Sequence, residues 1–450
     1  MPSAFLFDPN RCTGCQACEL ACSIENDLGA ELSWREVITF NDASIPGIPR
    51  FHLSLACNHC AEPACMYSCP ALAYSRDVST GAILIDPGRC IGCRYCSWAC
   101  PFGAPRYEAD RGVMGKCTFC SHRLAEGLKP ACATLCPTGA LDFAVLDASE
   151  LGGPVAGFPR TDLVPSIRIE VPRRAAHLAG AGASVADTSA APRPVPGVTL
   201  RSEWSLAAFT FLVAVLVAGF AGTLGGGPRP PAALFAAVAV VAAGLSFSHL
   251  GKPARAWRAG LNVRRSWLSR EVVGFGAFAS GATAVLTLGP STPATAAAAV
   301  AVAGLATLVS ADMVYRPVYP GRHPLLDDGG TLLTGVYLAG LWAGSPWLAG
   351  AAGLLKAVAV LRPASRSDSK HANLARNLAI PRLLLGLALP AVAWTASGAP
   401  LPEWVLLGAI GGEALGRVRF YLQLRVQSPA RQVRIDLAGA LASTLARPSA

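Results

Sequence analysis

The sequence predicts an α+β, cysteine-rich head domain followed by an all-α, polytopic membrane domain. Two observations lead to this fold class. All 16 cysteines of the 450 residues lie between positions 12 and 136, and from about residue 204 the composition changes to Ala, Leu, Val and Gly. That change explains an overall hydrophobic fraction of 52% and a charged fraction of only 15%. Such values are typical of a membrane protein that also carries a polar domain.

The cysteines form four groups of four whose spacing is typical of iron–sulfur ligands. Groups one and three, at 12–22 and 90–100, have the bacterial ferredoxin spacing C-x2-C-x2-C-x3-C. Group two, at 57–69, widens one gap, and group four, at 117–136, contains a longer loop. Three cysteines of one loop can bind three irons of a cubane while the fourth reaches a second cluster, so the groups are expected to work in pairs. The head is therefore predicted to be ferredoxin-like, with four 4Fe-4S clusters.

Structural zinc and disulfides are the competing explanations for these cysteines. Zinc ribbons separate their C-x2-C pairs by a dozen or more residues, whereas the first group has four thiols within eleven residues. Disulfides need an oxidising compartment, and residues 1–10 have neither the basic region nor the apolar core of an export signal. The predicted cluster ligands are Cys12, Cys15, Cys18, Cys22, Cys57, Cys60, Cys65, Cys69, Cys90, Cys93, Cys96, Cys100, Cys117, Cys120, Cys132 and Cys136.

Four regions are expected along the chain. They are a four-cluster electron-transfer domain at 1–150, a linker with an edge segment at 151–203, a membrane anchor at 204–424 and a cytoplasmic tail at 425–450. The anchor contains eight apolar stretches, most of them near the 20 residues that cross hydrocarbon. These stretches are 204–224, 231–250, 271–289, 294–315, 330–345, 347–361, 378–397 and 402–424. The fifth and sixth are short and could form a re-entrant pair instead.

Basic residues are distributed unequally between the loops that join these stretches. The opposite side holds Arg229 alone. The loops on the side of the head hold Lys252, Arg255, Arg258, Arg264, Arg265, Arg270, Arg316, Arg322, Arg362, Arg366, Lys370 and Arg376. This asymmetry predicts a multi-pass inner-membrane protein whose head and C-terminus face the cytoplasm, although these residues could also bind an acidic partner or the head. Because the net charge of +10 is concentrated in such loops, nucleic-acid binding is not expected.

Ionisable residues in the apolar stretches need a reason, because each costs about 2.5 to 3.5 kcal/mol at a helix centre. His249 ends the second stretch and Glu271 begins the third, so both are expected at the membrane face on the side of the head. Such a pair could exchange the two protons of a quinol, or be an interfacial His and a Glu favoured by the helix dipole. Glu413 and Arg417, four residues apart, are expected to pair. No other histidine is suited to ligate a membrane haem, so no haem is expected.

The chain resembles the dimethyl sulfoxide reductase family of molybdenum enzymes. Residues 1 to about 200 resemble its four-cluster electron-transfer subunit, and residues 204–424 resemble its eight-helix membrane anchor, as if two subunits were fused. The runs His249-Leu250-Gly251 and Ser266–Glu271 are similar to that family's signature around its menaquinol site. The resemblance implies that His249, Gly251 and Glu271 serve quinol binding and oxidation.

The resemblance also implies which cysteines share a cluster. All sixteen positions are cysteine, unlike the nitrate reductase relative, in which a Trp leaves a three-iron cluster. The implied sets are Cys12, Cys15 and Cys18 with Cys136; Cys117, Cys120 and Cys132 with Cys22; Cys57, Cys60 and Cys65 with Cys100; and Cys90, Cys93 and Cys96 with Cys69.

The function implied by the resemblance is an electron relay in anaerobic respiration. It would join menaquinone or ubiquinone in the bilayer to a separate molybdopterin catalytic subunit, with no catalytic residue in this chain. The best-known family member holds its catalytic subunit outside the cytoplasm, unlike the topology expected here. The alternative is therefore the reverse relay in a cytoplasm-facing sulfite:quinone oxidoreductase. A third hypothesis is a membrane scaffold whose clusters serve a sensor or an ion-pumping assembly.

Overall fold

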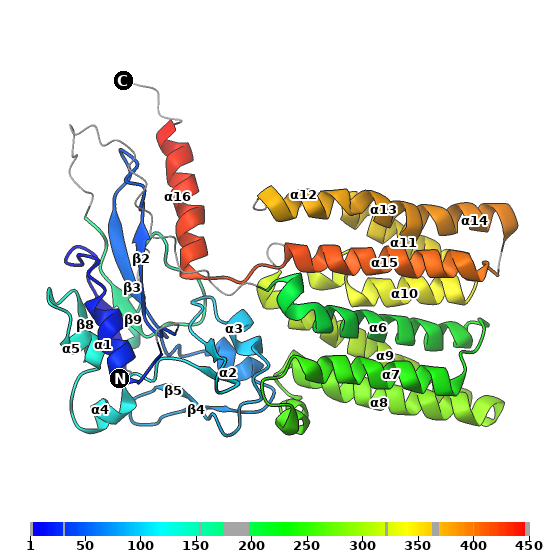
Figure 1. The fold of residues 1–450 in the computed structure, drawn as a ribbon, viewed down its shortest axis with the longest axis horizontal. Coiled ribbons are helices and arrows are strands. Elements are labelled where there is room, and N and C mark those ends of the chain that lie inside the picture. The colour runs from blue at the N-terminus through cyan, green and yellow to red at the C-terminus, as the bar shows by residue number, and fades with distance from the viewer. Residues whose placement is uncertain are drawn as a thin grey trace. The chain divides into compact units, whose positions relative to one another are not determined.

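The computed structural model describes residues 3–29, 32–152, 155–173, 198–319, 323–361, 369–398 and 400–445. The chain divides into two compact units (Figure 1). The first unit consists of Met1–Gly197 and Val426–Ala450, and the second of Val198–Arg425. Most of the expected linker, residues 174–197, lies outside the described residues, as do Arg322, Arg362, Arg366 and the last five residues.

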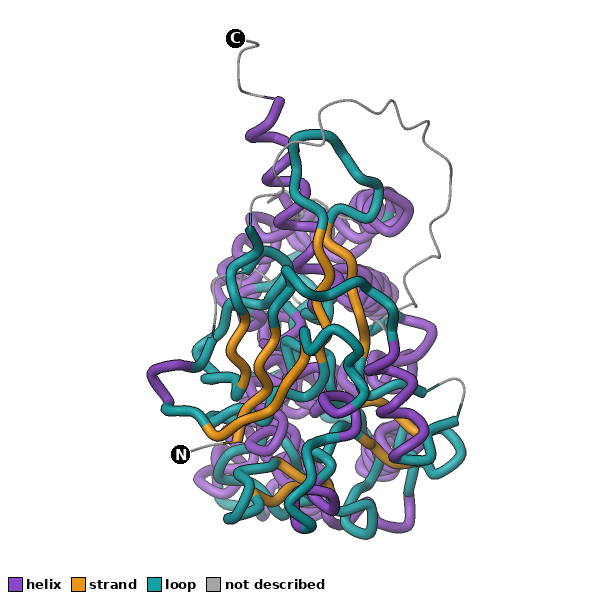
Figure 2. The backbone as a smooth tube through the Cα atoms, turned by 90° about the vertical axis from the view of Figure 1, so that its left-hand side faces the viewer, coloured by secondary structure: helices purple, strands orange, loops and turns teal. Residues whose placement is uncertain are grey.

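The first unit contains short β-sheets, drawn in orange in Figure 2. Its three-stranded sheet has the order β8-β1-β9, with β1 (Ser3–Phe7) antiparallel to β8 (Leu141–Val145) and parallel to β9 (Ile167–Ile169). Strand β9 lies at the sheet edge, in the region for which the sequence predicts an edge segment. Three further pairs are β2 (Glu36–Phe40) with β3 (Phe51–Leu55), β4 (Tyr74–Arg76) with β5 (Ile83–Ile85), and β6 (Arg106–Glu108) with β7 (Val113–Gly115).

Short helices of the first unit begin next to, or contain, cysteines of the four groups. They are α1 (Ala17–Glu25), α2 (Ala64–Ser68), α3 (Tyr95–Ala99), α4 (Ser121–Ala125) and α5 (Ala131–Thr134). Groups one and three have the same loop conformation before their helices. Gly14 and Gly92 have φ values of 71° and 70°, in the left-handed region that favours glycine. Gln16 and Arg94 follow with φ values of 61° and 60°. The repeated spacing therefore produces a repeated backbone turn around the thiols.

The last helix, α16 (Pro429–Leu445), belongs to the first unit although it follows the helical region in sequence. Val433 is buried in the apolar core of that unit, together with Leu53 of β3. The Gly157 N–H donates a 2.8 Å hydrogen bond to the Asp436 carboxylate. The segment predicted as a tail thus includes a helix that packs on the head.

The second unit is helical, and each of the eight apolar stretches lies in helical segments. These are α6 (Leu200–Leu224), α7 (Ala232–Ser248), α8 (Trp267–Leu288), α9 (Ala294–Val314), α10 (Thr331–Trp342), α11 (Pro346–Leu361), α12 (Ser369–Asn377), α13 (Ala379–Leu383), α14 (Leu389–Ser397) and α15 (Glu403–Gln423). A π-helical turn, Leu384–Ala388, separates α13 from α14. Pro390 cannot donate to the Gly386 carbonyl one turn earlier, and the Tyr337 hydroxyl donates to that carbonyl at 2.6 Å instead.

Four helical segments of the described residues are long and apolar enough to cross a membrane. They are Leu200–Leu224, Trp267–Ser291, Ala294–Val318 and Asn373–Ser397. Helix α7 would be a fifth span if it is taken together with the bent segment Pro253–Gly260. Helices α10 and α11 are shorter, and α15 contains three buried charged residues. By length and composition the structure therefore supports four or five spans rather than the eight expected.

Candidate functional site

All sixteen cysteines are free thiols in the described part of the chain, and eleven of them are buried. The structure therefore contains no disulfide between these cysteines, as expected from the sequence. No three His, Cys, Asp or Glu side chains among the described residues are grouped to hold a single metal ion. The thiols are instead spread around larger spaces between the loops.

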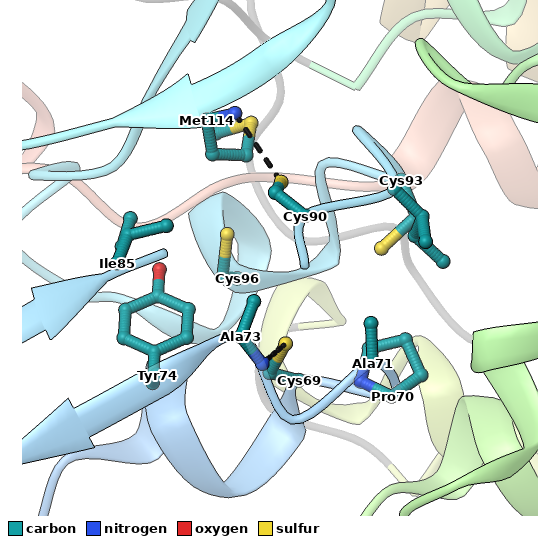
Figure 3. A pocket seen from close by; sticks show the side chains of 11 residues that line it. Cys69, Pro70, Ala71, Ala73, Tyr74, Ile85, Cys90, Cys93, Cys96 and Met114 are labelled. Atoms are coloured by element: carbon teal, nitrogen blue, oxygen red, sulfur yellow. Dashed lines mark hydrogen bonds between the residues drawn. The ribbon is translucent and has the colours of Figure 1, made fainter. Parts of the chain in front are cut away.

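One such space is a cavity with about 300 Å³ of empty volume (Figure 3). Its lining includes Cys69 from group two and Cys90, Cys93 and Cys96 from group three. The Cys69 thiol accepts the Ala73 N–H at 3.4 Å, and the Cys90 thiol accepts two backbone N–H groups at the same distance. Hydrogen bonds of this kind stabilise thiolates and the clusters that they hold. Four thiols from two loops around one cavity fit a 4Fe-4S cluster.

The other twelve cysteines form three similar sets. Burial raises the pKa of Cys12, Cys22 and Cys65, that of Cys22 to about 12, and nearby thiols raise each of them further. With those neighbours, the sets are Cys12, Cys15, Cys18 and Cys136; Cys22, Cys117, Cys120 and Cys132; and Cys57, Cys60, Cys65 and Cys100. Together with the cavity, these are the four sets that the resemblance implies. We name them the Cys12, Cys22, Cys57 and Cys69 sets.

Electrostatic interactions between thiols also connect neighbouring sets. Cys18 of the Cys12 set interacts with Cys132 of the Cys22 set, and Cys117 of the latter interacts with Cys57. Tyr74 lies next to thiols of both the Cys57 set and the Cys69 set. The four sets therefore follow one another in a row from the Cys12 set to the Cys69 set.

Two buried cations lie between these sets, and the sequence analysis missed both. Arg35 is 1% exposed, and its guanidinium interacts with thiols of the Cys12 and Cys22 sets. Lys116 donates to the carbonyl oxygens of Ile83 and Cys117, and its charge acts on thiols of the Cys57 set. Neither residue belongs to a cysteine motif, so no local pattern singled them out.

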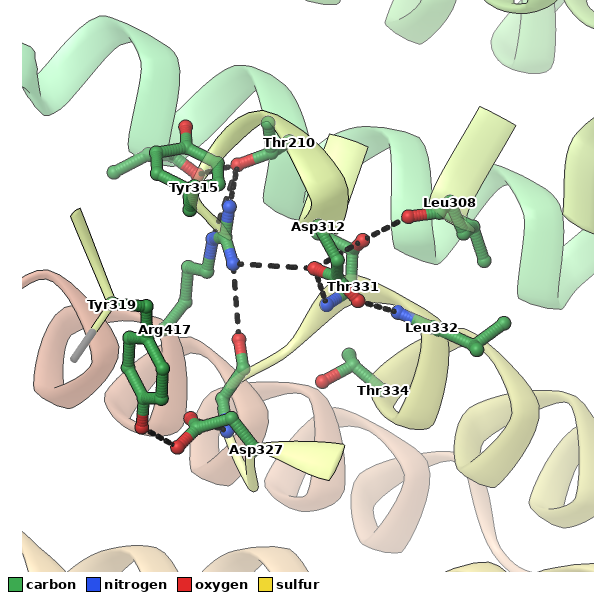
Figure 4. A network of polar contacts seen from close by, with 12 residues as sticks. Thr210, Leu308, Asp312, Tyr315, Tyr319, Asp327, Thr331, Leu332, Thr334 and Arg417 are labelled. Atoms are coloured by element: carbon green, nitrogen blue, oxygen red, sulfur yellow. Dashed lines mark hydrogen bonds and ion pairs between the residues drawn. The ribbon is translucent and has the colours of Figure 1, made fainter. Parts of the chain in front are cut away.

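A connected polar network occupies the interior of the helical unit (Figure 4). Arg417 of α15 donates to the Thr210 hydroxyl at 2.8 Å and to the Gly329 carbonyl at 3.2 Å, and lies 3.9 Å from the Asp312 carboxylate. Asp312 in turn accepts the backbone N–H groups of Thr331 and Leu332 at the start of α10. A carboxylate at a helix N-terminus is favoured by the unpaired N–H groups there.

Glu413 does not pair with Arg417, so that prediction was wrong. Its carboxylate lies 2.8 Å from the Lys356 ammonium of α11 and 3.6 Å from Arg382 of α13. Asp328 pairs with Arg382 at 3.0 Å and with Arg419 at 2.9 Å. Side chains one helical turn apart on α15 thus pair with different helices, because buried charges take the nearest opposite charge in space.

The residues expected to serve quinol lie at one end of the α7–α8 pair. His249 follows α7 directly, Gly251 lies in the next turn, and Glu271 is in the first turns of α8. Glu271 is 4% exposed, and Arg417 and Asp312 act on it electrostatically. The structure therefore links Glu271 to the polar network of α9 and α15, which the sequence alone did not indicate.

Comparison with known proteins identifies the cysteine-rich part. Residues 49–146 match the 4Fe-4S dicluster domain family. The protein is 39% identical over 189 residues to the iron–sulfur subunit of the anaerobic dimethyl sulfoxide reductase of Haemophilus influenzae, a match that covers 92% of that subunit and 39% of this chain. The chain belongs to the family of dimethyl sulfoxide reductase iron–sulfur subunits. Its relative in the Escherichia coli reductase is 43% identical over 151 residues, or 73% of that protein and 32% of this chain.

Other relatives in this family have different names. A subunit of the sulfite dehydrogenase of Allochromatium vinosum is 35% identical over 161 residues, or 67% of that protein and 31% of this chain. Since the match to the Haemophilus relative accounts for 39% of this chain, the chain is much longer than such an iron–sulfur subunit alone. Its helical unit fits a membrane anchor fused to the iron–sulfur subunit.

Proposed function

We propose that this chain relays electrons between a membrane quinone and a separate molybdopterin-containing catalytic subunit. The observation that carries the proposal is the row of four thiol sets, of which the Cys69 set surrounds a cavity (Figure 3). In this proposal each set holds one 4Fe-4S cluster. Such clusters accept and release single electrons and can serve as steps of a wire. The names of the relatives, each one chain of a reductase, support a catalytic partner on another chain.

The helical unit would anchor the relay in the inner membrane. Both ends of this unit continue into the first unit, at residues 198 and 425. A folded domain occupies one side of a membrane, so the chain between these residues would cross an even number of times. We propose eight crossings, in which α10, α11, α15 and α7 join the four long apolar helices. The basic loop residues support a head that faces the cytoplasm.

His249, Gly251 and Glu271 would form the quinone site in this proposal. Oxidation of a quinol releases two protons together with two electrons, so the site needs groups that accept protons. Glu271 is a buried carboxylate next to the Arg417 and Asp312 charges, and His249 lies at the same end of the α7–α8 pair. Menaquinone and ubiquinone share the reacting carbonyl oxygens that such groups would contact.

Glu271→Gln tests the quinone site because it keeps the size of the side chain but removes its ability to accept a proton. We expect quinol-driven reduction of the clusters to slow by about 10²- to 10⁴-fold, the usual contribution of a general base. The visible absorbance of the clusters after mixing with a menaquinol analogue measures this rate. Glu403→Gln, at an exposed position of α15, is the matched control. An unchanged rate in Glu271→Gln would remove the quinone assignment.

A sulfite-oxidising complex is the second candidate, with electrons flowing from the catalytic subunit to quinone. The relative named as a sulfite dehydrogenase subunit favours it, as does the cytoplasmic side proposed for the head. Purification of the intact complex separates the two candidates. Sulfite-dependent reduction of the clusters would support this direction, and reoxidation of reduced clusters by dimethyl sulfoxide would support the other.

A further inference from the structure

Arg35 is a charged side chain buried in the first unit without a carboxylate partner among the described residues. Its Nη1 atom donates to the Ser54 hydroxyl at 3.0 Å and to the Ser54 carbonyl at 3.2 Å. Its guanidinium carbon lies 4.4 Å from the centre of the Phe5 ring. The Nε and Nη2 atoms have no hydrogen-bond partner within the described part of the chain. A buried guanidinium is strongly unfavourable unless anions compensate its charge.

The anions available to Arg35 are the thiolates of two neighbouring sets. Burial lowers the pKa of Arg35, but Cys132, Cys18 and Cys117 raise it, so the group stays charged. The Ser54 hydroxyl that Arg35 contacts also lies 3.2 Å from the Cys18 sulfur. Arg35 therefore reaches the Cys12 set through Ser54 and lies beside the Cys22 set. Its two unsatisfied N–H groups are the donors that cluster sulfurs would accept.

The Cys69 set has a different environment. Burial is the main cause that raises the pKa of Cys69 and Cys96, and their further neighbours are thiols, backbone N–H groups and the Tyr74 hydroxyl. No Lys or Arg is among those neighbours. Two ends of the row thus differ in whether a fixed positive charge is present.

We propose that Arg35 is the counter-cation of the clusters held by the Cys12 and Cys22 sets, and that it raises their reduction potentials. This inference rests on the proposed function. When such a cluster takes up one electron, its negative charge increases by one and no bond of the protein forms or breaks. A fixed cation in a poorly solvated site favours the reduced state. Electrons would therefore be drawn towards the Cys12 end of the row.

Arg35→Gln tests the inference in the full chain, purified anaerobically with its co-purifying partner. A mediated redox titration followed by electron paramagnetic resonance gives the cluster potentials. We expect two of the four potentials to fall by at least the equivalent of a tenfold change in the reduction equilibrium, about 59 mV for one electron. The other two should stay within error. Arg50→Gln removes the same charge from a half-exposed pair with Asp42 and should shift none.

The iron content separates the possible outcomes. Wild-type chain without iron would contradict the proposed function itself. Arg35→Gln with full iron and four unchanged potentials would overturn only the role of Arg35. If Arg35→Gln loses iron, Arg35→Lys decides, because it keeps the charge: retained iron with near-native potentials supports the inference. Loss of iron in Arg35→Lys as well would assign Arg35 a packing role and overturn it.

Discussion

Buried cations have different partners in the two units of this chain. In the helical unit, Lys356, Arg382 and Arg417 each lie within 4 Å of a carboxylate from another helix or loop. In the first unit, Arg35 and Lys116 are equally buried but have thiols and carbonyl groups around them. The helical unit therefore balances its own charge, whereas the head leaves positive charge for an anionic cofactor. Each unit should respond differently to loss of metal and to loss of a carboxylate.

Removal of the clusters is expected to have the largest effect. Without metal the four thiol sets lose the bonds that join their loops, and metal binding supplies much of the folding free energy of such domains. After oxidative cluster loss and chelation, we expect residues 3–173 to become sensitive to proteolysis. The helices between 198 and 425 should stay protected in detergent. Mass spectrometry of the fragments measures both, and protection of the head without iron would contradict the expectation.

Loss of a carboxylate should instead affect the helical unit. Glu413→Ala leaves the buried Lys356 and Arg382 side chains without this partner. Breaking a buried pair in this way costs about 3 to 5 kcal/mol. We expect a lower thermal unfolding midpoint of the helical unit in detergent, with the cluster absorbance unchanged below that temperature.

Two further variants test this interpretation of Glu413. Glu403→Ala removes an exposed carboxylate from the same helix and should change the midpoint little. The double variant Lys356→Met with Glu413→Leu removes both charges and should recover much of the stability. If the double variant is as unstable as Glu413→Ala, shape rather than charge balance explains the effect.

The smallest effect concerns helix α16. Asp436→Ala removes the acceptor of the Gly157 N–H, which should reduce the stability of the first unit by about 1 kcal/mol. Chemical unfolding followed through the cluster absorbance measures it. Ser443→Ala, at an exposed position of α16, is the control. Equal stability of the two variants would argue against a tight packing of α16 on the head.

The parts of the structure that depend on local sequence were predictable. Cysteine spacing indicated the family of iron–sulfur subunits, which the comparisons confirm. Runs of apolar residues indicated the helices of the second unit, because such runs report burial directly. The number of spans was less certain, since helices such as α10 are too short to cross hydrocarbon alone.

Features that depend on distant residues could not be predicted in the same way. The Glu413–Lys356 pair joins α15 to α11, and Lys356 lies in a stretch that otherwise reads as apolar. Arg35 lies in a segment between two cysteine groups, where a lone arginine is usually exposed. Helix α16 has few apolar residues, and only the core of the first unit shows which of them are buried. Each of these contacts is set by the tertiary fold.

The most direct test is the iron and acid-labile sulfide content of the chain after anaerobic purification. Four thiol sets that each hold a 4Fe-4S cluster predict about 16 iron and 16 sulfide per chain, with spectra of interacting clusters on reduction. Cys69→Ser and Cys90→Ser, which alter the same cavity, should each affect the same single cluster. Zinc in place of iron, or separate clusters affected by these two variants, would contradict the account.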